Sequence, residues 1–130
     1  MKMRLRHGLP FVEMEVVFGG QSVRLGHVLV DTGSAGTLVA IDAVAGVQIE
    51  PRPEDRLRTI RGVGGVEAVF TRRVDRLEVG EAKVEDFEIE VGGMDYGFEI
   101  DGIIGTDFLL RSRAIIDMAR CELMFEKGQA

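Results

Sequence analysis

The sequence has few of the residues on which several protein classes depend. Among its 130 residues there is a single cysteine, Cys121, so no internal disulfide can form and no cysteine-based metal site is indicated. Tryptophan is absent, and one tyrosine and seven phenylalanines stand beside seventeen glycines, a balance that favours turns and strands over a helical bundle. The two histidines, His7 and His27, stand alone in the sequence and are interpreted as surface or strand-edge residues.

Two further absences limit the partners and the location of the protein. No run of about 18 apolar residues is present, so we expect no membrane partner. The formal net charge of −6 makes a nucleic-acid partner unfavourable. The basic first residues are followed by Glu13 and Glu15 instead of the apolar stretch of a signal peptide, and we therefore expect a cytoplasmic protein.

Short apolar segments separated by turn residues fill the rest of the chain, of which 45% is hydrophobic. This pattern predicts one mostly-β domain over residues 1–130. Strands are expected at about 11–18, 23–30, 74–79, 84–91, 114–117 and 121–125, with a glycine-rich hairpin over 59–70.

Helical and charged segments are fewer. The best helix candidate is 106–111, which Thr106 can cap through its hydroxyl, and one helical turn is expected at about 42–45, with Gly46 as its stop. The arginines near residue 75 (Arg72, Arg73 and Arg76, with Asp75) are interpreted as a solvated strand face.

The motif Asp31-Thr32-Gly33 carries the chemistry of the sequence. It directly follows Val28-Leu29-Val30, a run apolar enough for a strand buried on both faces. A carboxylate at the end of such a strand is costly without partners, which makes it a candidate functional group. Thr32 supplies a hydroxyl, and Gly33 allows a close approach of the backbone. Taken alone, the motif also fits an ordinary surface turn.

Two other segments accompany this motif in order along the chain. Ile103-Ile104-Gly105 comes some seventy residues later, and the hairpin with Gly62-Val63-Gly64-Gly65 lies between. In this combination the sequence resembles the retropepsin-like, or retroviral-type, aspartic proteases and their bacterial relatives over roughly residues 9–125. The resemblance implies an all-β fold: a closed β-barrel with one short helix near the C-terminus and a glycine-rich β-hairpin flap.

Asp31 matches the catalytic aspartate of that family. Because the chain has one such triplet and the chemistry needs two carboxylates, the resemblance implies a homodimer with Asp31 of each subunit at the axis. Terminal strands, about 2–6 and 121–125 here, build the dimer sheet in this family. The two carboxyl groups share one proton and activate a water that hydrolyses a peptide bond, with neither metal nor other cofactor.

Further matches imply supporting roles around the catalytic pair. Thr32 matches the threonine that hydrogen-bonds across the dimer axis, and Ser34 is expected to donate to Asp31, giving an optimum at lower pH than in Ser34→Ala. Asp107 is expected to support the loop from behind. Positions that carry acidic residues and an arginine in retroviral enzymes are Ala35, Gly36 and Thr106 here.

The hairpin matches the family's flap. Val63 is expected at its tip, with Gly62, Gly64 and Gly65 providing freedom for closure over a peptide bound in extended conformation. Arg61 either selects acidic groups in the substrate or faces solvent, and we favour the second interpretation. The apolar residues that match pocket walls are Ile60, Val63, Ile103 and Ile104, although ordinary core positions fit Ile103 and Ile104 equally well.

Three functions fit these observations. The first is an aspartic endopeptidase. The second is a catalytically weak or inactive domain of the same fold that dimerises and holds peptide. The third lies outside the family and is a small β-barrel that binds a ligand in its mouth.

Overall fold

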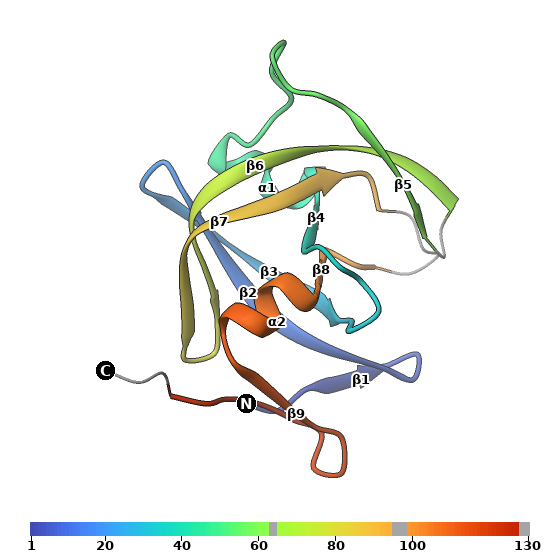
Figure 1. Cartoon of the computed structure of the whole chain (residues 1–130), viewed down its shortest axis with the longest axis vertical. Coiled ribbons are helices and arrows are strands. Elements are labelled where there is room, and N and C mark those ends of the chain that lie inside the picture. The colour runs from blue at the N-terminus through green and yellow to red at the C-terminus, as the bar shows by residue number, and fades with distance from the viewer. Residues whose placement is uncertain (63–64, 95–98, 128–130) are drawn as a thin grey trace.

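The computed structural model describes residues 1–62, 65–94 and 99–127, and for 60–62 and 65–67 it describes the backbone alone. Strands dominate this part of the chain (Figure 1). The strands are β1 Arg4–Arg6, β2 Leu9–Phe18, β3 Gln21–Val30, β4 Leu38–Ala40, β5 Arg58–Gly62, β6 Gly65–Val79, β7 Ala82–Gly92, β8 Gly102–Ile104, β9 Ala114–Asp117 and β10 Glu122–Phe125. The helical segments are α1 Ile41–Val44, the 3₁₀ helix η1 Ala45–Val47 and α2 Thr106–Arg111.

Eight of these strands form one sheet in the order β1-β2-β3-β8-β4-β7-β6-β5. In addition, β6, near one end of this order, pairs antiparallel with β2, near the other end. β9 and β10 pair separately as a hairpin near the N-terminus (Figure 1). The prediction of a mostly-β fold with a short helix near the C-terminus is thus confirmed.

The centre of the sheet brings together segments that are far apart in the sequence. β8 pairs in parallel with β3, which places Leu29 beside Ile103 and Val30 beside Ile104. On its other edge β8 pairs antiparallel with β4, with Leu38 opposite Ile103. The end of β3 and the end of β8 therefore lie side by side, and the loops that follow both strands meet at one place.

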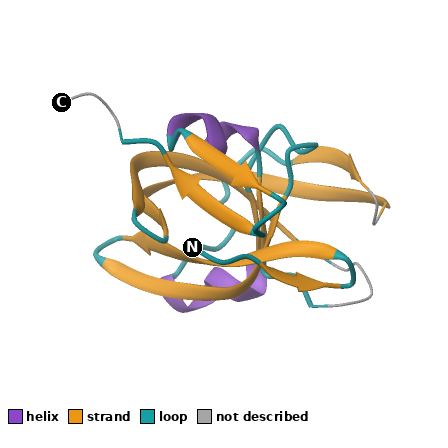
Figure 2. Ribbon diagram, turned by 90° about the horizontal axis from the view of Figure 1, so that it is seen from below, coloured by secondary structure: helices purple, strands orange, loops and turns teal. Residues whose placement is uncertain are grey.

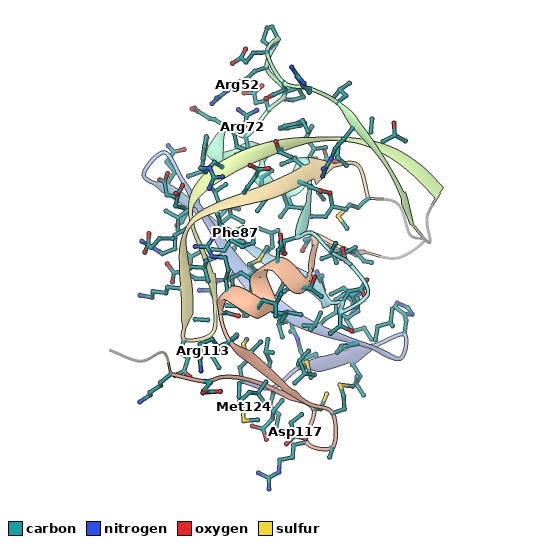
Figure 3. The ribbon with its side chains drawn as sticks, viewed as in Figure 1. Arg52, Arg72, Phe87, Arg113, Asp117 and Met124 are labelled. Atoms are coloured by element: carbon teal, nitrogen blue, oxygen red, sulfur yellow. The ribbon has the colours of Figure 1, made fainter. Side chains whose placement is uncertain are left out.

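Alternation along β7 builds much of the core. Phe87, Ile89 and Val91 are all at most 2% exposed, as the apolar pattern predicted. The ring of Phe87, which is labelled in Figure 3, meets that of Phe108 edge to face, with centroids 5.8 Å apart. This contact docks α2 onto the sheet. Figure 2 shows the two helical regions on opposite sides of the strands.

Several element boundaries differ from the prediction. β6 is one continuous strand from residue 65 to 79, where the pattern indicated two separate strands. α2 has the predicted bounds. The helical turn α1 does not stop at Gly46, because it continues directly into η1, which includes that glycine. The left-handed backbone of Gln48, with a φ of 65°, ends it instead. Among the described residues, no helix is both long and apolar enough to cross a membrane.

Arg72 contradicts the expectation of a solvated strand face. Its side chain is only 6% exposed and lies beneath the loop that carries Arg52 (Figure 3). One Nη atom bonds the carboxylate of Asp55 at 2.6 Å and also the carbonyl of Glu50 at 3.0 Å. The guanidinium also stacks over the ring of Phe70. This buried ion pair holds the loop that leads into β5 against the middle of β6.

Replacing Arg72 by methionine should therefore destabilise the fold. The variant leaves the Asp55 carboxylate, 14% exposed, without its counter-charge, which we expect to cost about 3 kcal/mol in the free energy of unfolding. Urea unfolding followed by circular dichroism measures the change. Arg73→Met is the matched control, because the Arg73 side chain is 57% exposed and its loss should change stability by well under about 1 kcal/mol. Equal losses in the two variants would contradict the assignment.

Candidate active site

Asp31 stands at the first position after β3. Its amide donates to the carbonyl of Ile104 at 3.0 Å, so the strand pairing between β3 and β8 extends into the loop. One carboxylate oxygen, Oδ1, accepts the amide of Gly33 at 2.8 Å, and the Asp31 carbonyl accepts the amide of Ser34 at 3.2 Å. These bonds fold residues 31–34 into a tight turn that fixes the direction of the carboxylate.

From the sequence we expected a buried Asp31 side chain, but in the structure it is only partly buried. Asp31 is half-buried, while Thr32 and Gly33 are exposed in the single chain. The loop thus presents its carboxylate and the Thr32 hydroxyl at the surface. A carboxylate held by one backbone amide at a surface is available for water or for a second chemical group.

The segment after β8 passes beneath this loop. The amide of Thr106 donates to the carbonyl of Ser34 at 2.8 Å, and the amide of Asp107 donates to that of Ala35 at 3.3 Å. Between them, Gly105 lies so close to the loop that a Cβ there would be 2.3 Å from the carbonyl oxygen of Gly36. Only glycine allows two backbones to pass at this distance.

Asp107 and Thr37 form a polar network behind the loop. The Asp107 carboxylate accepts both the hydroxyl of Thr37, at 2.7 Å, and its amide, at 3.1 Å. The same hydroxyl oxygen accepts the amide of Gly105 at 3.1 Å, and Thr37 is fully buried. The amide and hydroxyl of Thr37 therefore connect Asp107 of α2 to the loop, and the same hydroxyl joins both to Gly105. Such a satisfied buried network holds its members in one arrangement.

Thr37 was missed by the sequence reasoning. A threonine before Leu38-Val39 looks like an ordinary strand residue, and nothing around it signals a role. The one available signal was indirect: a carboxylate expected behind the loop, Asp107, needs buried donors, and Thr37 is a hydroxyl on the chain leaving that loop.

Two predicted hydrogen bonds are wrong. The Ser34 hydroxyl donates to the carbonyl of Gly36 at 2.7 Å, so its only proton is not available to Asp31, and the expected acid shift relative to Ser34→Ala loses its cause. Thr106 does not cap α2, because it is the first helical residue and Gly105 is the N-cap. Its hydroxyl donates to the carbonyl of Ala35 at 3.3 Å instead.

The four residues predicted as pocket walls lie in different surroundings, and two of them are core residues. Ile104 is fully buried in the main core with Phe108, so it supports the loop from inside and is not a pocket wall. Ile103 is 7% exposed and packs with Phe11 and Leu38, which also favours the core interpretation. Ile60 is described by its backbone alone, in β5, and Val63 lies outside the described residues.

A β-hairpin is present where the flap was predicted. β5 pairs antiparallel with β6, from Arg58 opposite Val69 to Gly62 opposite Gly65. Val63 and Gly64, the expected tip, lie outside the described residues. The paired strands project from the rest of the sheet in both overall views (Figures 1 and 2).

The base of this hairpin contacts the Asp31 loop through Glu90. Arg58 of β5 donates to the Glu90 carboxylate, which is 20% exposed. The Glu90 carboxylate lies 3.2 Å from the position that a Cβ of Gly36 would occupy, and the Glu90 amide donates to the Thr37 carbonyl at 2.9 Å. One residue of β7 therefore touches both the hairpin and the loop.

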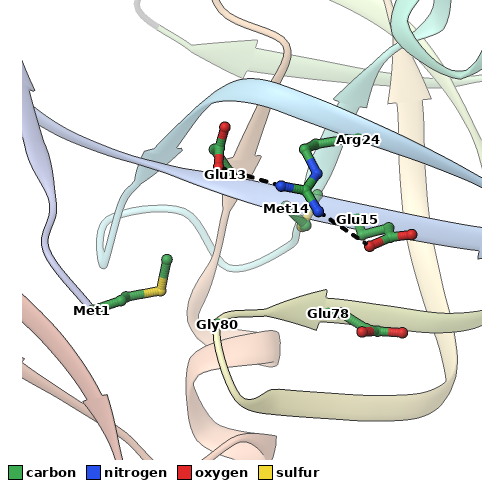
Figure 4. Close-up of a pocket in the computed structure, with 7 residues that line it drawn as sticks. All are labelled: Met1, Glu13, Met14, Glu15, Arg24, Glu78 and Gly80. Carbon is green, nitrogen blue, oxygen red and sulfur yellow. Dashed lines mark ion pairs between the residues drawn. The ribbon is translucent and has the colours of Figure 1, made fainter.

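Two pockets of the described residues lie away from the Asp31 loop. One, with a volume of about 230 Å³, is lined by Met1, Arg24 and Gly80 among others, and Arg24 reaches toward Glu13 and Glu15 across it (Figure 4). None of its lining residues belongs to the Asp31 loop, to β8 or to the hairpin. The Asp31 loop therefore does not line this pocket.

The arrangement of an aspartate turn crossed by an apolar-apolar-glycine strand defines a class of protein. The sequence model of the aspartyl protease family matches residues 14–108, which include the turn, the hairpin and Gly105. The chain therefore belongs to the aspartyl protease family, within the retropepsin-like clan. No match was found among curated proteins. The family match excludes the third function considered above, a ligand-binding barrel outside this family.

Gly105→Ala should disturb the loop directly. The added methyl meets backbone oxygens of Gly36 and Ser34 at 2.3 and 2.8 Å, which cannot move as a flexible side chain can. We expect a loss of about 3 kcal/mol in unfolding free energy, measured by urea titration. Gly93→Ala is the control, since no atom lies within 4 Å of its added Cβ. Equal stability of the two variants would show that the close crossing is absent in solution.

The Thr37 relay is tested by a pair of substitutions. Thr37→Val keeps the shape but removes the hydroxyl, which leaves the buried Gly105 amide without its acceptor and Asp107 with one donor fewer, and we expect a loss of about 2 kcal/mol in unfolding free energy. Thr37→Ser retains the hydroxyl and should lose less. Amide hydrogen exchange at Gly105 provides a local readout, and protection there should fall in the valine variant only. Unchanged protection in both would contradict the relay.

Proposed function

We propose that the chain is an aspartic endopeptidase that works as a homodimer, with a water activated between Asp31 and its symmetry mate. The observation that carries the proposal is the Asp31 carboxylate, which accepts the Gly33 amide in a loop of this family and stays half-exposed in the single chain. A second copy of the loop would supply the other carboxylate and bury both. We also propose that residues 1–130 form one domain whose strands close into the family's barrel.

The proposed chemistry uses one shared proton. Two carboxyl groups about 3 Å apart, as the two Asp31 side chains would be in this dimer, cannot both be ionised. The ionised Asp31 takes a proton from the water as its oxygen attacks the scissile carbonyl, while the protonated partner donates to the carbonyl oxygen, giving a diol. Collapse of the diol breaks the C–N bond, with a proton passing to the leaving amine. Neither carboxylate can perform both roles alone.

The rigid support beneath the loop favours this function. General acid–base catalysis requires the carboxylates to be held within a fraction of an ångström, because small displacements cost large factors in rate. The Thr37–Asp107 network and the Gly105 crossing provide such support within each chain. Thr32 is exposed beside Asp31, so its side chain is accessible to a second chain, as its family role requires.

The hairpin and the chain termini support substrate binding and dimerisation. The proposed flap, with Gly62, Val63, Gly64 and Gly65, would close over an extended peptide and exclude water. Residues 1–3 hydrogen-bond residues 121–123, so the two terminal segments form one surface. On the adjoining β9–β10 hairpin, Ile115 and Met124 pair across the strands and are 46% and 36% exposed. An apolar face there favours burial against a partner.

One observation favours the alternative, a weak or inactive domain that dimerises and holds peptide. Ala35, Gly36 and Thr106 bind the loop through neutral backbone groups and hydroxyls, without the charged residues that join the two chains in retroviral enzymes. The complete Asp31 turn favours the protease. Activity measured at a known dimer concentration separates the two.

Asp31→Asn should abolish cleavage of a mixed peptide library between about pH 3 and pH 8, because the amide can neither accept nor share the proton. Wild-type activity per chain should rise with dimer fraction, measured by sedimentation. Asp42→Asn, an exposed aspartate on α1, is the matched control and should cut normally. A confirmed wild-type dimer that cuts nothing would support the peptide-holding alternative.

Mixing variants tests the shared site. When Asp31→Asn is added to a fixed amount of wild type and the chains exchange, wild-type chains enter inactive heterodimers, and about half of the activity should remain at a 1:1 ratio. Asp42→Asn added in the same way should not inhibit. Full wild-type activity in excess Asp31→Asn would show that one chain is a complete enzyme.

A further inference from the structure

His27, Glu99 and Asp101 form a group of potential ligands outside the proposed active site. His27 lies on β3, and the two acidic residues lie just before β8, so the group joins the two strands that carry Asp31 and Gly105. Within the group, one ligand atom from each residue lies within 4.8 Å of the others. The sequence, in which His27 stands 72 positions from Glu99, indicated no metal site.

The imidazole of His27 has an unexplained buried atom. Its Nδ1 is inaccessible to solvent and has no hydrogen-bond partner among the described residues. It faces the Asp101 carboxylate at 3.4 Å and the Glu99 carboxylate at 3.5 Å. A nitrogen lone pair directed at two carboxylates is repulsive, so a positive group is required between them: a proton on Nδ1 or a metal ion.

The distances favour the metal ion. A charge-assisted N–H···O bond brings nitrogen and oxygen to about 2.7–2.9 Å, well inside the separations of 3.4 and 3.5 Å found here. In a tetrahedral zinc site, with bonds of about 2.0–2.2 Å, neighbouring ligand atoms lie roughly 3.3–3.6 Å apart. The separation of 3.5 Å between His27 Nδ1 and the Glu99 oxygen matches this spacing.

The surroundings of Asp101 fit a prepared ligand. Its Oδ2, the oxygen that lies 3.4 Å from Nδ1, accepts the amides of Gly26 and His27 at 3.1 and 3.0 Å, which fixes the carboxylate and assigns the role of ligand to its other oxygen, Oδ1. The backbone of Asp101 also bonds β3 and β4, through the His27 carbonyl and the Ala40 amide, both at 2.8 Å. Glu99 is 65% exposed and can move aside, which provides an entry path.

We propose that His27, Glu99 and Asp101 bind one Zn²⁺ ion, with water at the fourth position. One imidazole and two carboxylates suit zinc, whereas Mg²⁺ and Ca²⁺ prefer six or more oxygen ligands. The ion bridges β3 to the segment that enters β8, and so stabilises the base of the loop pair that carries Asp31 and Gly105. It takes no part in the peptide-cleaving chemistry proposed above.

Zinc binding to the full chain, measured by isothermal titration calorimetry at pH 7.5, tests the proposal. Wild type should bind one equivalent, and Glu99→Gln and His27→Ala should each bind at least about tenfold more weakly. Co²⁺ should give the intense visible absorption of a tetrahedral site in wild type only. Glu99→Gln alters an exposed side chain and keeps the fold, which circular dichroism verifies.

Matched controls are His7→Asn, which removes the other histidine at a left-handed position that asparagine tolerates, and Glu81→Gln, an exposed glutamate in the β6–β7 turn. Both should bind zinc as wild type does. Asp31→Asn should also bind normally, so failure of the protease proposal leaves this one standing. Absence of zinc binding by wild type, or wild-type affinity in either Glu99→Gln or His27→Ala, would overturn it in favour of a proton on His27.

Discussion

The contact between the backbone at Gly105 and the backbone of residues 34–36 is the constraint on which the candidate site depends. On each side of the crossing a hydrogen bond joins the two segments, from Asp31 to Ile104 and from Thr106 to Ser34. The carbonyl of Gly36 lies where any larger residue at position 105 would place its Cβ. Because main chain meets main chain, neither side can yield by changing a rotamer, and the aspartate turn has one position relative to the sheet.

Support for this crossing comes from neutral groups in place of ion pairs. Thr37 relays the Asp107 carboxylate to the Gly105 amide, and hydroxyls of Ser34 and Thr106 satisfy carbonyls of the loop. Short hydrogen bonds to the half-buried Asp107 carboxylate orient their donors without a counter-charge from another chain. Each chain can therefore hold its own half of the proposed site in shape, which leaves burial of the Asp31 carboxylate as the contribution of a partner.

Charged contacts are placed around the proposed flap instead. Arg58 joins the hairpin base to Glu90, which lies against Gly36, and Arg72 with Asp55 anchors the loop that leads into β5. We expect the two ion pairs to differ in strength, because solvent screens the more exposed Arg58–Glu90 pair but not the buried Arg72–Asp55 pair. The hairpin and the loop that leads into it are thus held to the rest of the sheet at their base.

The sequence by itself determined the class of fold, the aspartate turn, the crossing glycine and the bounds of α2, because these are written in local patterns: alternation, apolar runs that end in a turn, and motifs in order. It did not determine the partners of polar side chains. Ser34 and Arg72 were both misassigned, and Thr37 was missed, because a hydroxyl or a guanidinium bonds whichever groups the fold brings near. Only the pairing of β3 with β8 decided that His27 would lie beside Asp101 and that residues 34–36 would cross Gly105. Contacts between segments some seventy positions apart depend on strand register, a property of the whole sheet that no local pattern contains.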